Sequence, residues 1–109
     1  MIGHSNSRYR QGTNFANNTI IGVDAYRHSS SFNGGGSMVV IGNNAGKLWG
    51  DGGYSVIIGK DASAQTTASH NSSSSVIIGY RAAYKMGDGG SGKSKNVFIG
   101  YGAASGATN

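Results

Sequence analysis

The apolar residues of this chain are concentrated in short runs that end in Ile-Gly and recur about every twenty residues. The full runs occupy residues 18–25, 38–45, 55–62, 75–82 and 96–103, and a truncated copy occupies residues 1–3. The successive Ile-Gly pairs are 19, 20, 17, 20 and 21 residues apart. A repeat of this period predicts a stacked architecture, in which each repeat buries its hydrophobic face against its neighbours.

Three consecutive residues before each glycine are apolar and mostly β-branched, which predicts short strands. In a strand, Val76 and Ile78 point to one face and Ile77 points to the other, so both faces are apolar. We assign Val76 and Ile78 to the core of their own chain and Ile77 to a contact with a second copy. The sequence predicts an all-β fold, a parallel β-solenoid or β-roll of about five to six coils of 17–21 residues, as an intertwined or side-by-side homotrimer.

The residues after each predicted strand indicate a tight turn. Glycine permits a bend or a positive φ, and two positions later most repeats carry Asp, Asn or Gly, which tolerate left-handed backbone. An alanine follows in all five full repeats, which predicts a close approach of neighbouring coils. The predicted structural anchors are Gly22, Gly42, Gly59, Gly79, Gly100, Ile20, Val40, Ile57, Ile77 and Phe98.

The composition narrows the class of protein. The 109 residues include 20 glycines and neither proline nor cysteine, so disulfides and thiolate metal sites are excluded. No apolar run is long enough to span a membrane, and we expect no membrane insertion. The net charge of +5 suits an acidic partner, but the charges are spread along the chain, so we expect no specific nucleic acid partner. The opening in the middle of a repeat favours a fragment of a longer fibre.

The pattern Ser/Asn-Val-x-Ile-Gly-x-x-Ala resembles the head repeats of trimeric autotransporter adhesins and, still more, the repeats of bacteriophage tail fibres and spikes. The nearest copy is residues 96–103, and the resemblance covers residues 18–105. It implies a homotrimer of parallel β-rolls or β-helical coils that presents loops to a host surface. The repeats here are longer than those of the adhesin heads, and the middle residue of the triplet is bulkier. The resemblance supplies no catalytic residues.

Two motifs raise the possibility of an enzyme. Residues 87–94 match the phosphate-binding P-loop, but a predicted strand follows them where that motif requires a helix. The Ile-Gly-x-x-Ala pattern is also found in hexapeptide-repeat acyltransferases, where it recurs every six residues and works with a catalytic histidine. Here it occurs once in about twenty residues, and His4, His28 and His70 lie in polar spacers. We therefore expect no catalytic residues, no metal site and no cofactor, with the acyltransferase as the alternative.

Aromatic side chains near cationic ones suggest a receptor-binding surface. Aromatic rings can stack on sugar faces while Arg and Lys pair with acidic groups. Tyr80 and Tyr101 follow the repeat glycine, and an alternative role for such rings is to cap coils or pack between subunits. The receptor-binding candidates are Trp49, Tyr80, Arg81, Tyr84, Lys85, Tyr26 and Arg27.

These observations predict a non-enzymatic structural and adhesive module of a phage tail fibre, spike or cell-surface adhesin. We expect residues 1–17 to form an N-terminal edge coil, frayed in part, and residues 18–109 to form the repeat module. The expected partners are two further copies in a homotrimer, a host surface glycan or other envelope receptor, and other fibre or virion proteins. The expected location is the virion or, as an alternative, the bacterial cell surface. A purely structural fibre spacer is a further alternative.

Overall fold

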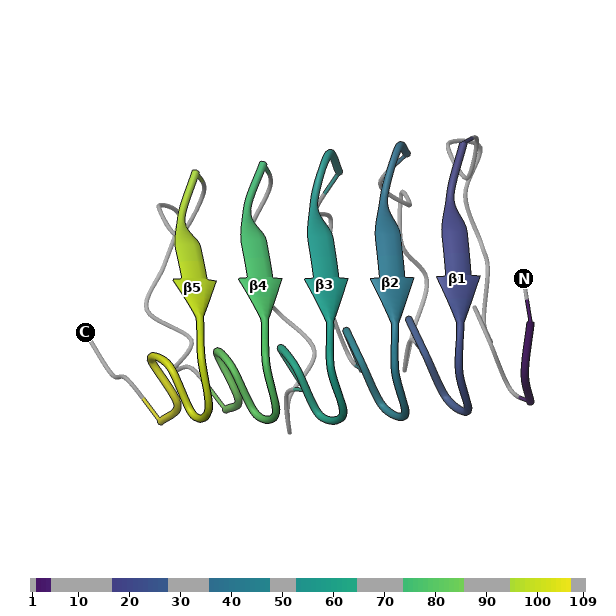
Figure 1. Ribbon diagram of the computed structural model, residues 1–109. Coiled ribbons are helices and arrows are strands. Elements are labelled where there is room, and N and C mark those ends of the chain that lie inside the picture. Colours follow the sequence, from purple (N-terminus) through teal and green to yellow (C-terminus); the bar gives the residue numbers. More distant parts are fainter. Residues whose placement is uncertain are drawn as a thin grey trace.

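The computed structural model describes residues 2–4, 17–27, 36–47, 53–64, 74–85 and 95–106, and these residues form an all-β structure without a helix. Five strands lie side by side in one parallel sheet, in the order in which they occur along the chain (Figure 1). They are β1 (Thr19–Ile21), β2 (Val39–Ile41), β3 (Val56–Ile58), β4 (Val76–Ile78) and β5 (Val97–Ile99). Each coincides with an apolar triplet, so the predicted strand positions are confirmed.

The register of the sheet places equivalent positions of successive repeats next to one another. Ile57 of β3, for example, pairs with Val40 of β2 and with Ile77 of β4. The pattern extends to the truncated N-terminal copy, where Ile2 forms a parallel bridge with Ile21. We call such a row of equivalent residues a column, and a strand with its following turn a repeat unit.

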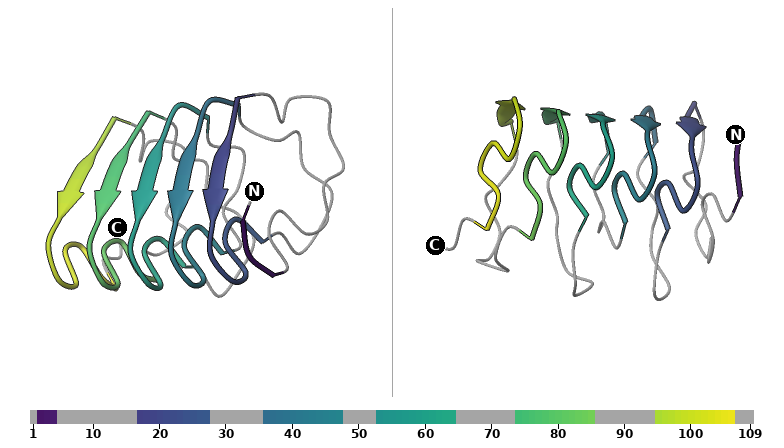
Figure 2. Two further views of the ribbon diagram at one scale, coloured as in Figure 1. Left: turned by 45° about the vertical axis from the view of Figure 1, so that its right-hand side comes forward. Right: turned by 60° about the horizontal axis from the view of Figure 1, so that its bottom comes forward.

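Each strand leads into two overlapping turns, which the unit of β3 illustrates. The amide of Ala62 donates to the carbonyl of Gly59 at 3.2 Å, and the amide of Ala64 donates to the carbonyl of Asp61 at 3.2 Å. The third residues of these turns, Asp61 and Ser63, have φ values of 56° and 52°. Positive φ at this position alone is the mark of a type II turn. The turns form a second row beside the sheet (Figure 2).

Backbone hydrogen bonds between repeat units continue through the turns. The amide of Asp61 donates to the carbonyl of Asn43 in the preceding unit at 2.9 Å. The amide of Ser63 donates to the carbonyl of Ala82 in the following unit at 2.7 Å. Polar backbone groups that a turn would leave exposed are therefore paired, and the units stack along the whole strand and turn.

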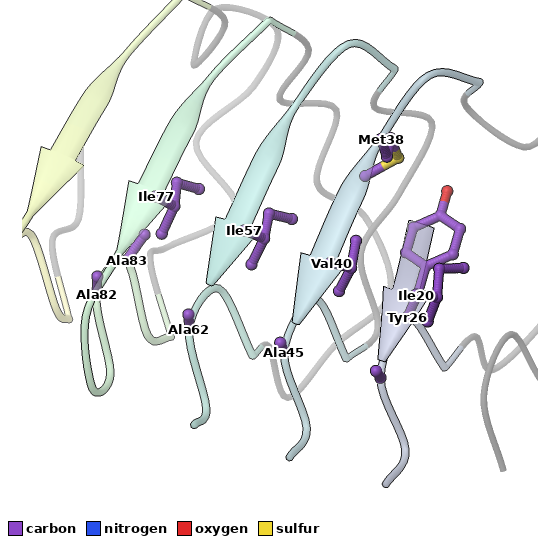
Figure 3. Packing of buried hydrophobic residues seen from close by; sticks show 11 residues of the cluster. Ile20, Tyr26, Met38, Val40, Ala45, Ile57, Ala62, Ile77, Ala82 and Ala83 are labelled. Carbon is purple, nitrogen blue, oxygen red and sulfur yellow. The ribbon is translucent and has the colours of Figure 1, made fainter. Parts of the chain in front are cut away.

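The core of the described residues is a narrow row of side chains between the sheet and the turns (Figure 3). It contains the middle residue of each of the first four strands and the alanine of each following turn. All of these side chains are buried: Ile20, Val40, Ile57, Ile77, Ala25, Ala45, Ala62 and Ala82. Phe98 of β5 is half-buried against the same cluster. The predicted apolar anchors of the repeat thus form the core of a single chain.

The assignment of the two strand faces from the sequence is wrong. Ile77 is buried within its own chain, whereas Val76 and Ile78 are half-buried on the opposite face of the sheet. The physical reason is the thinness of the interior. Only one side chain per strand fits between the sheet and the alanine of the turn, and the strand pleat sends its two neighbours outward.

A ladder of side-chain hydrogen bonds supports the entry to the strands. The residue before each triplet is Asn or Ser in four of the five repeats. The Oγ of Ser55 accepts from the amide of Ser75 at 3.2 Å, and the Oγ of Ser75 accepts from the amide of Asn96 at 3.3 Å. In the first repeat, the Oδ1 of Asn18 accepts from the amide of Met38 at 2.9 Å. Each of these side chains satisfies a donor of the next repeat unit.

Candidate functional site

Aromatic and cationic side chains meet at the turns that follow β4 and β5. The Cζ of Arg81 lies 5.3 Å from the ring centroid of Tyr80 and 4.8 Å from that of Tyr84. The Nζ of Lys85 lies 5.3 Å from the centroid of Tyr84, and the rings of Tyr80 and Tyr101 have centroids 5.4 Å apart. These five residues, which we call the aromatic–cationic cluster, bring four of the predicted receptor-binding residues together.

The repeat frame positions each member of the cluster. Tyr80 and Tyr101 occupy the same column, directly after the repeat glycine, so the parallel stacking of β4 and β5 sets their separation. Arg81 and Tyr84 are the first and last residues of the second turn, in which the amide of Tyr84 donates to the carbonyl of Arg81 at 3.2 Å. The turn therefore folds the guanidinium back between the two rings of its own unit.

Arg81 departs from the residue type that its backbone favours. Its φ is 55°, and the same column holds Asp24, Asn44, Asp61 and Gly102, which tolerate left-handed backbone better. A long side chain in this conformation carries a steric cost that the other repeats avoid. Residues that break a local rule of their own fold are concentrated at functional sites. The turn sequence thus marks Arg81 independently of its neighbours.

The charges of the described residues leave the cluster with an excess of positive charge. The one ion pair within the described ranges joins Arg27 to Asp24, with 3.6 Å between Nη1 and Oδ2. The carboxylate of Asp61 accepts a hydrogen bond from the Nδ2 of Asn44 at 3.1 Å. Both carboxylates therefore have partners in the turns of the first three units, and Arg81 and Lys85 remain available to an anion from outside.

Two other predicted site residues lie away from the cluster. Tyr26 is only 1% exposed and belongs to the core, so the prediction of a surface role for Tyr26 is corrected. Its ring packs beside Gly46, whose position holds a Cβ-sized space 3.6 Å from Tyr26 Cδ2. Arg27 is in the unit of β1, three strand spacings from β4, or about 14 Å. Trp49 lies outside the described residues.

A signal in the sequence indicates the burial of Tyr26. The other residues of its column are small, namely Gly46, Ser63, Ala83 and Ala104, and a column of small residues is typical of a buried position. Tyr101, by contrast, is 83% exposed and extends the cluster beyond the predicted candidates. Its position in the same slot as Tyr80 is the signal that links it to the site.

The described residues offer little for catalysis. No group of three His, Asp or Glu side chains among them is placed to hold a metal ion. The P-loop match at residues 87–94 lies outside the described residues, as do His28 and His70. In the described ranges, no helix has the length and hydrophobicity to cross a membrane.

The arrangement of the cluster suits the binding of a sugar that carries an acidic group. An exposed tyrosine ring presents an apolar face with a polar hydroxyl at its edge. A guanidinium presents a planar fork of donors that matches a carboxylate, sulfate or phosphate group. No protein-family model, curated protein or solved structure matches this chain.

Proposed function

We propose that this chain is a β-solenoid module of a homotrimeric phage tail fibre or spike, or of a related cell-surface adhesin, that binds a host surface glycan without chemistry. The parallel stack of repeat units serves as a rigid frame. The turns beside the sheet present the aromatic–cationic cluster. On this proposal the protein acts in the virion or at a bacterial cell surface, together with other fibre proteins.

The observation that carries the proposal is the packing of Arg81 between Tyr80 and Tyr84. Two contacts at 5.3 and 4.8 Å hold the guanidinium without an acidic partner. Contacts of this kind between a cation and a ring are worth about 0.5 to 1 kcal/mol each at exposed sites. They restrict the side chain before a ligand arrives and lower the entropic cost of binding.

The outer face of the sheet supports association into a trimer. It is formed by the first and third residues of each strand, which carry no charge: Thr19, Ile21, Val39, Ile41, Val56, Ile58, Val76, Ile78, Val97 and Ile99. The apolar residues of β2, β3 and β4 on this face are only half-buried within one chain. A parallel sheet with an uncovered apolar face is unusual, because both faces of such sheets are normally buried. In a trimer, further copies cover this face.

A trimer also strengthens weak binding. Three copies of the cluster on one particle bind a surface that carries many copies of a glycan, and the second and third contacts form at high effective concentration. Useful attachment therefore follows from individually weak sites, provided that the three clusters reach the surface together.

Binding to an array of bacterial and host surface glycans tests the adhesive role. We expect binding to sugars with acidic groups and its loss in Arg81→Ala. Arg27→Ala is the matched control, because Arg27 is paired with Asp24 at 3.6 Å and lies apart from the cluster. An equal loss in both variants would indicate nonspecific charge attraction. The absence of any glycan ligand for the wild-type protein would leave the structural spacer as the function.

Analytical ultracentrifugation tests the trimer and the face that forms it. We expect Ile78→Lys, on the outer face, to dissociate the trimer into folded chains. Ile77→Ala, one residue away but in the core, is expected to lower the free energy of unfolding by about 2 to 5 kcal/mol. A wild-type protein that sediments as a monomer at all concentrations would refute the trimer.

A further inference from the structure

The last described repeat unit leaves one edge of the sheet open. Val97 and Ile99 of β5 are 67% and 64% exposed, although their counterparts in β2, β3 and β4 are half-buried. Each inner strand has a neighbour on both sides, whereas β5 pairs with β4 alone (Figure 1). Apolar surface that every inner repeat unit buries is therefore uncovered at this end.

The backbone of β5 at the open edge is oriented for one more parallel strand. On the β4 side, the carbonyl of Asn96 accepts from Val76 and the amide of Gly100 donates to Ile78. In a parallel ladder the alternate residues point the other way, so the amides and carbonyls of Val97 and Ile99 face outward. Their spacing matches that with which β4 receives β5.

The turn after β5 continues the same pattern. In the preceding unit, the carbonyl of Tyr80 accepts from the amide of Gly102 at 2.9 Å, and the amide of Ala83 donates to the carbonyl of Ala103 at 2.7 Å. The equivalent groups of the last unit, the carbonyl of Tyr101 and the amide of Ala104, form no hydrogen bond with any described residue. The open edge thus repeats both the strand half and the turn half of the internal interface.

Gly100 adds a steric feature that selects the partner. It has the same φ of 134° as Gly22, Gly42 and Gly79, but no atom lies within 4 Å of the position that its Cβ would take. In each earlier unit this space is filled by the carbonyl of the next repeat glycine. The vacant position at Gly100 therefore fits the backbone of another Ile-Gly turn and excludes a strand that continues straight past it.

We propose that the β5 edge is a docking site for a strand–turn segment of the same repeat type, carried by another polypeptide. The segment adds a sixth parallel strand. Its Ser or Asn carbonyl accepts from Val97, its glycine amide donates to Ile99, and its glycine carbonyl occupies the space beside Gly100. Its middle apolar side chain covers Phe98, which the described core leaves half-buried. The interface between β4 and β5 continues without a change of register.

The choice of partner rests on this continuity. An unpaired strand edge accepts many extended peptides in principle. A generic strand, however, satisfies only the groups of Val97 and Ile99. A segment with the sequence pattern of this repeat also satisfies Tyr101 and Ala104 and fits the site at Gly100. The surface is therefore matched to a repeat-bearing neighbour in an extended fibre.

A fluorescently labelled synthetic peptide with the sequence of residues 74–85 serves as the probe. We expect saturable binding to the 109-residue protein by fluorescence anisotropy, with one peptide per chain. A peptide with Asp in place of Ile77 is the matched control, because its middle side chain places a charge against Phe98. This control peptide is expected not to bind.

Two protein variants locate the binding to the β5 edge. Val97→Pro removes the outward amide, and proline is tolerated where a strand amide faces solvent. Gly100→Ala fills the vacant space. Circular dichroism checks that each variant is folded, and we expect both to lose peptide binding. The proposal is overturned if the wild-type protein does not bind the peptide, or if both folded variants bind it as the wild type does.

Discussion

A Cβ atom at Gly42 would lie 2.5 Å from the carbonyl oxygen of Gly59, closer than any real side chain approaches a backbone oxygen. The two glycines are equivalent residues of neighbouring repeat units. Their φ values of 134° and 133° lie in a region that L side chains rarely adopt. The repeat glycine is thus required twice, once by its own backbone and once by the unit stacked against it.

Replacement of Gly42 separates these two requirements when it is compared with replacement of Gly100. Gly100 has the same φ of 134° but open space beside it. We expect Gly42→Ala to lower the free energy of unfolding by about 3 to 5 kcal/mol, through clash and strain together. Gly100→Ala is expected to cost about 1 to 2 kcal/mol, through strain alone. Urea denaturation measures both, and equal losses would contradict the steric role of the stacked carbonyl.

The ladder of side-chain acceptors predicts a loss of stability in Ser75→Ala. The hydroxyl of Ser75 is buried and accepts from the amide of Asn96 at 3.3 Å, so its removal leaves a buried donor without this partner. We expect a decrease of about 1 to 2 kcal/mol in the free energy of unfolding. Ser105→Ala, at an exposed serine, is the control and is expected to change stability by less than about 0.5 kcal/mol. A neutral Ser75→Ala would show that the hydroxyl is dispensable.

Ser63→Ala is expected to have the opposite sign. Ser63 is as buried as Ser75, but its Oγ has no hydrogen-bond partner among the described residues. Ala83 and Ala104 occupy the same column with φ values of 53° and 55°, close to the 52° of Ser63, so alanine fits this backbone. We expect thermal and urea denaturation to show an increase of about 1 kcal/mol, because an unsatisfied buried hydroxyl is removed. A destabilised variant would contradict this account.

The left-handed backbone of Arg81 predicts a difference between two substitutions that remove the same contacts. Arg81→Asn and Arg81→Ala both eliminate the packing against Tyr80 and Tyr84. Because asparagine tolerates a φ of 55° better than alanine does, we expect Arg81→Asn to be the more stable by about 1 kcal/mol. Glycan binding is expected to be lost equally in both. Recovery of binding in the more stable variant would show that Arg81 acts through folding and not through the ligand.

The strand positions were predictable because two local signals agree. The β-branched triplets and the glycine after them recur with a fixed order, and the structure places β1 to β5 on those triplets. The turn chemistry was equally readable, since Asp24, Asn44 and Asp61 all have positive φ. Each of these features depends on residues close together in the sequence.

The direction of the strand faces was not predictable from the triplets alone. Ile77 and Ile78 have the same hydrophobicity and shape, so the sequence at these two positions gives no reason to bury one within the chain. The thickness of the interior decides, and it depends on how closely the turn alanine returns to the sheet. Tyr26 was misassigned for a related reason, because its burial follows from the small residues of neighbouring units.

The composition of the candidate site was partly predictable. Arg81, Tyr84 and Lys85 are close in sequence and share one turn, so their proximity follows from local structure. The contact between Tyr80 and Tyr101 crosses two units and depends on the register of the sheet. Tyr101 therefore joins the site only once the stacking of the repeat units is known.

The stacking of repeat units also determines how the protein responds to mechanical force. The strands lie across the direction in which the units follow one another (Figure 1). Tension between the two ends therefore loads the backbone hydrogen bonds of one interface at a time, since each unit contacts only its neighbours. Under load we expect such a chain to lengthen in steps of one unit, beginning at an end, so that a tethered fibre yields gradually while the remaining units stay folded.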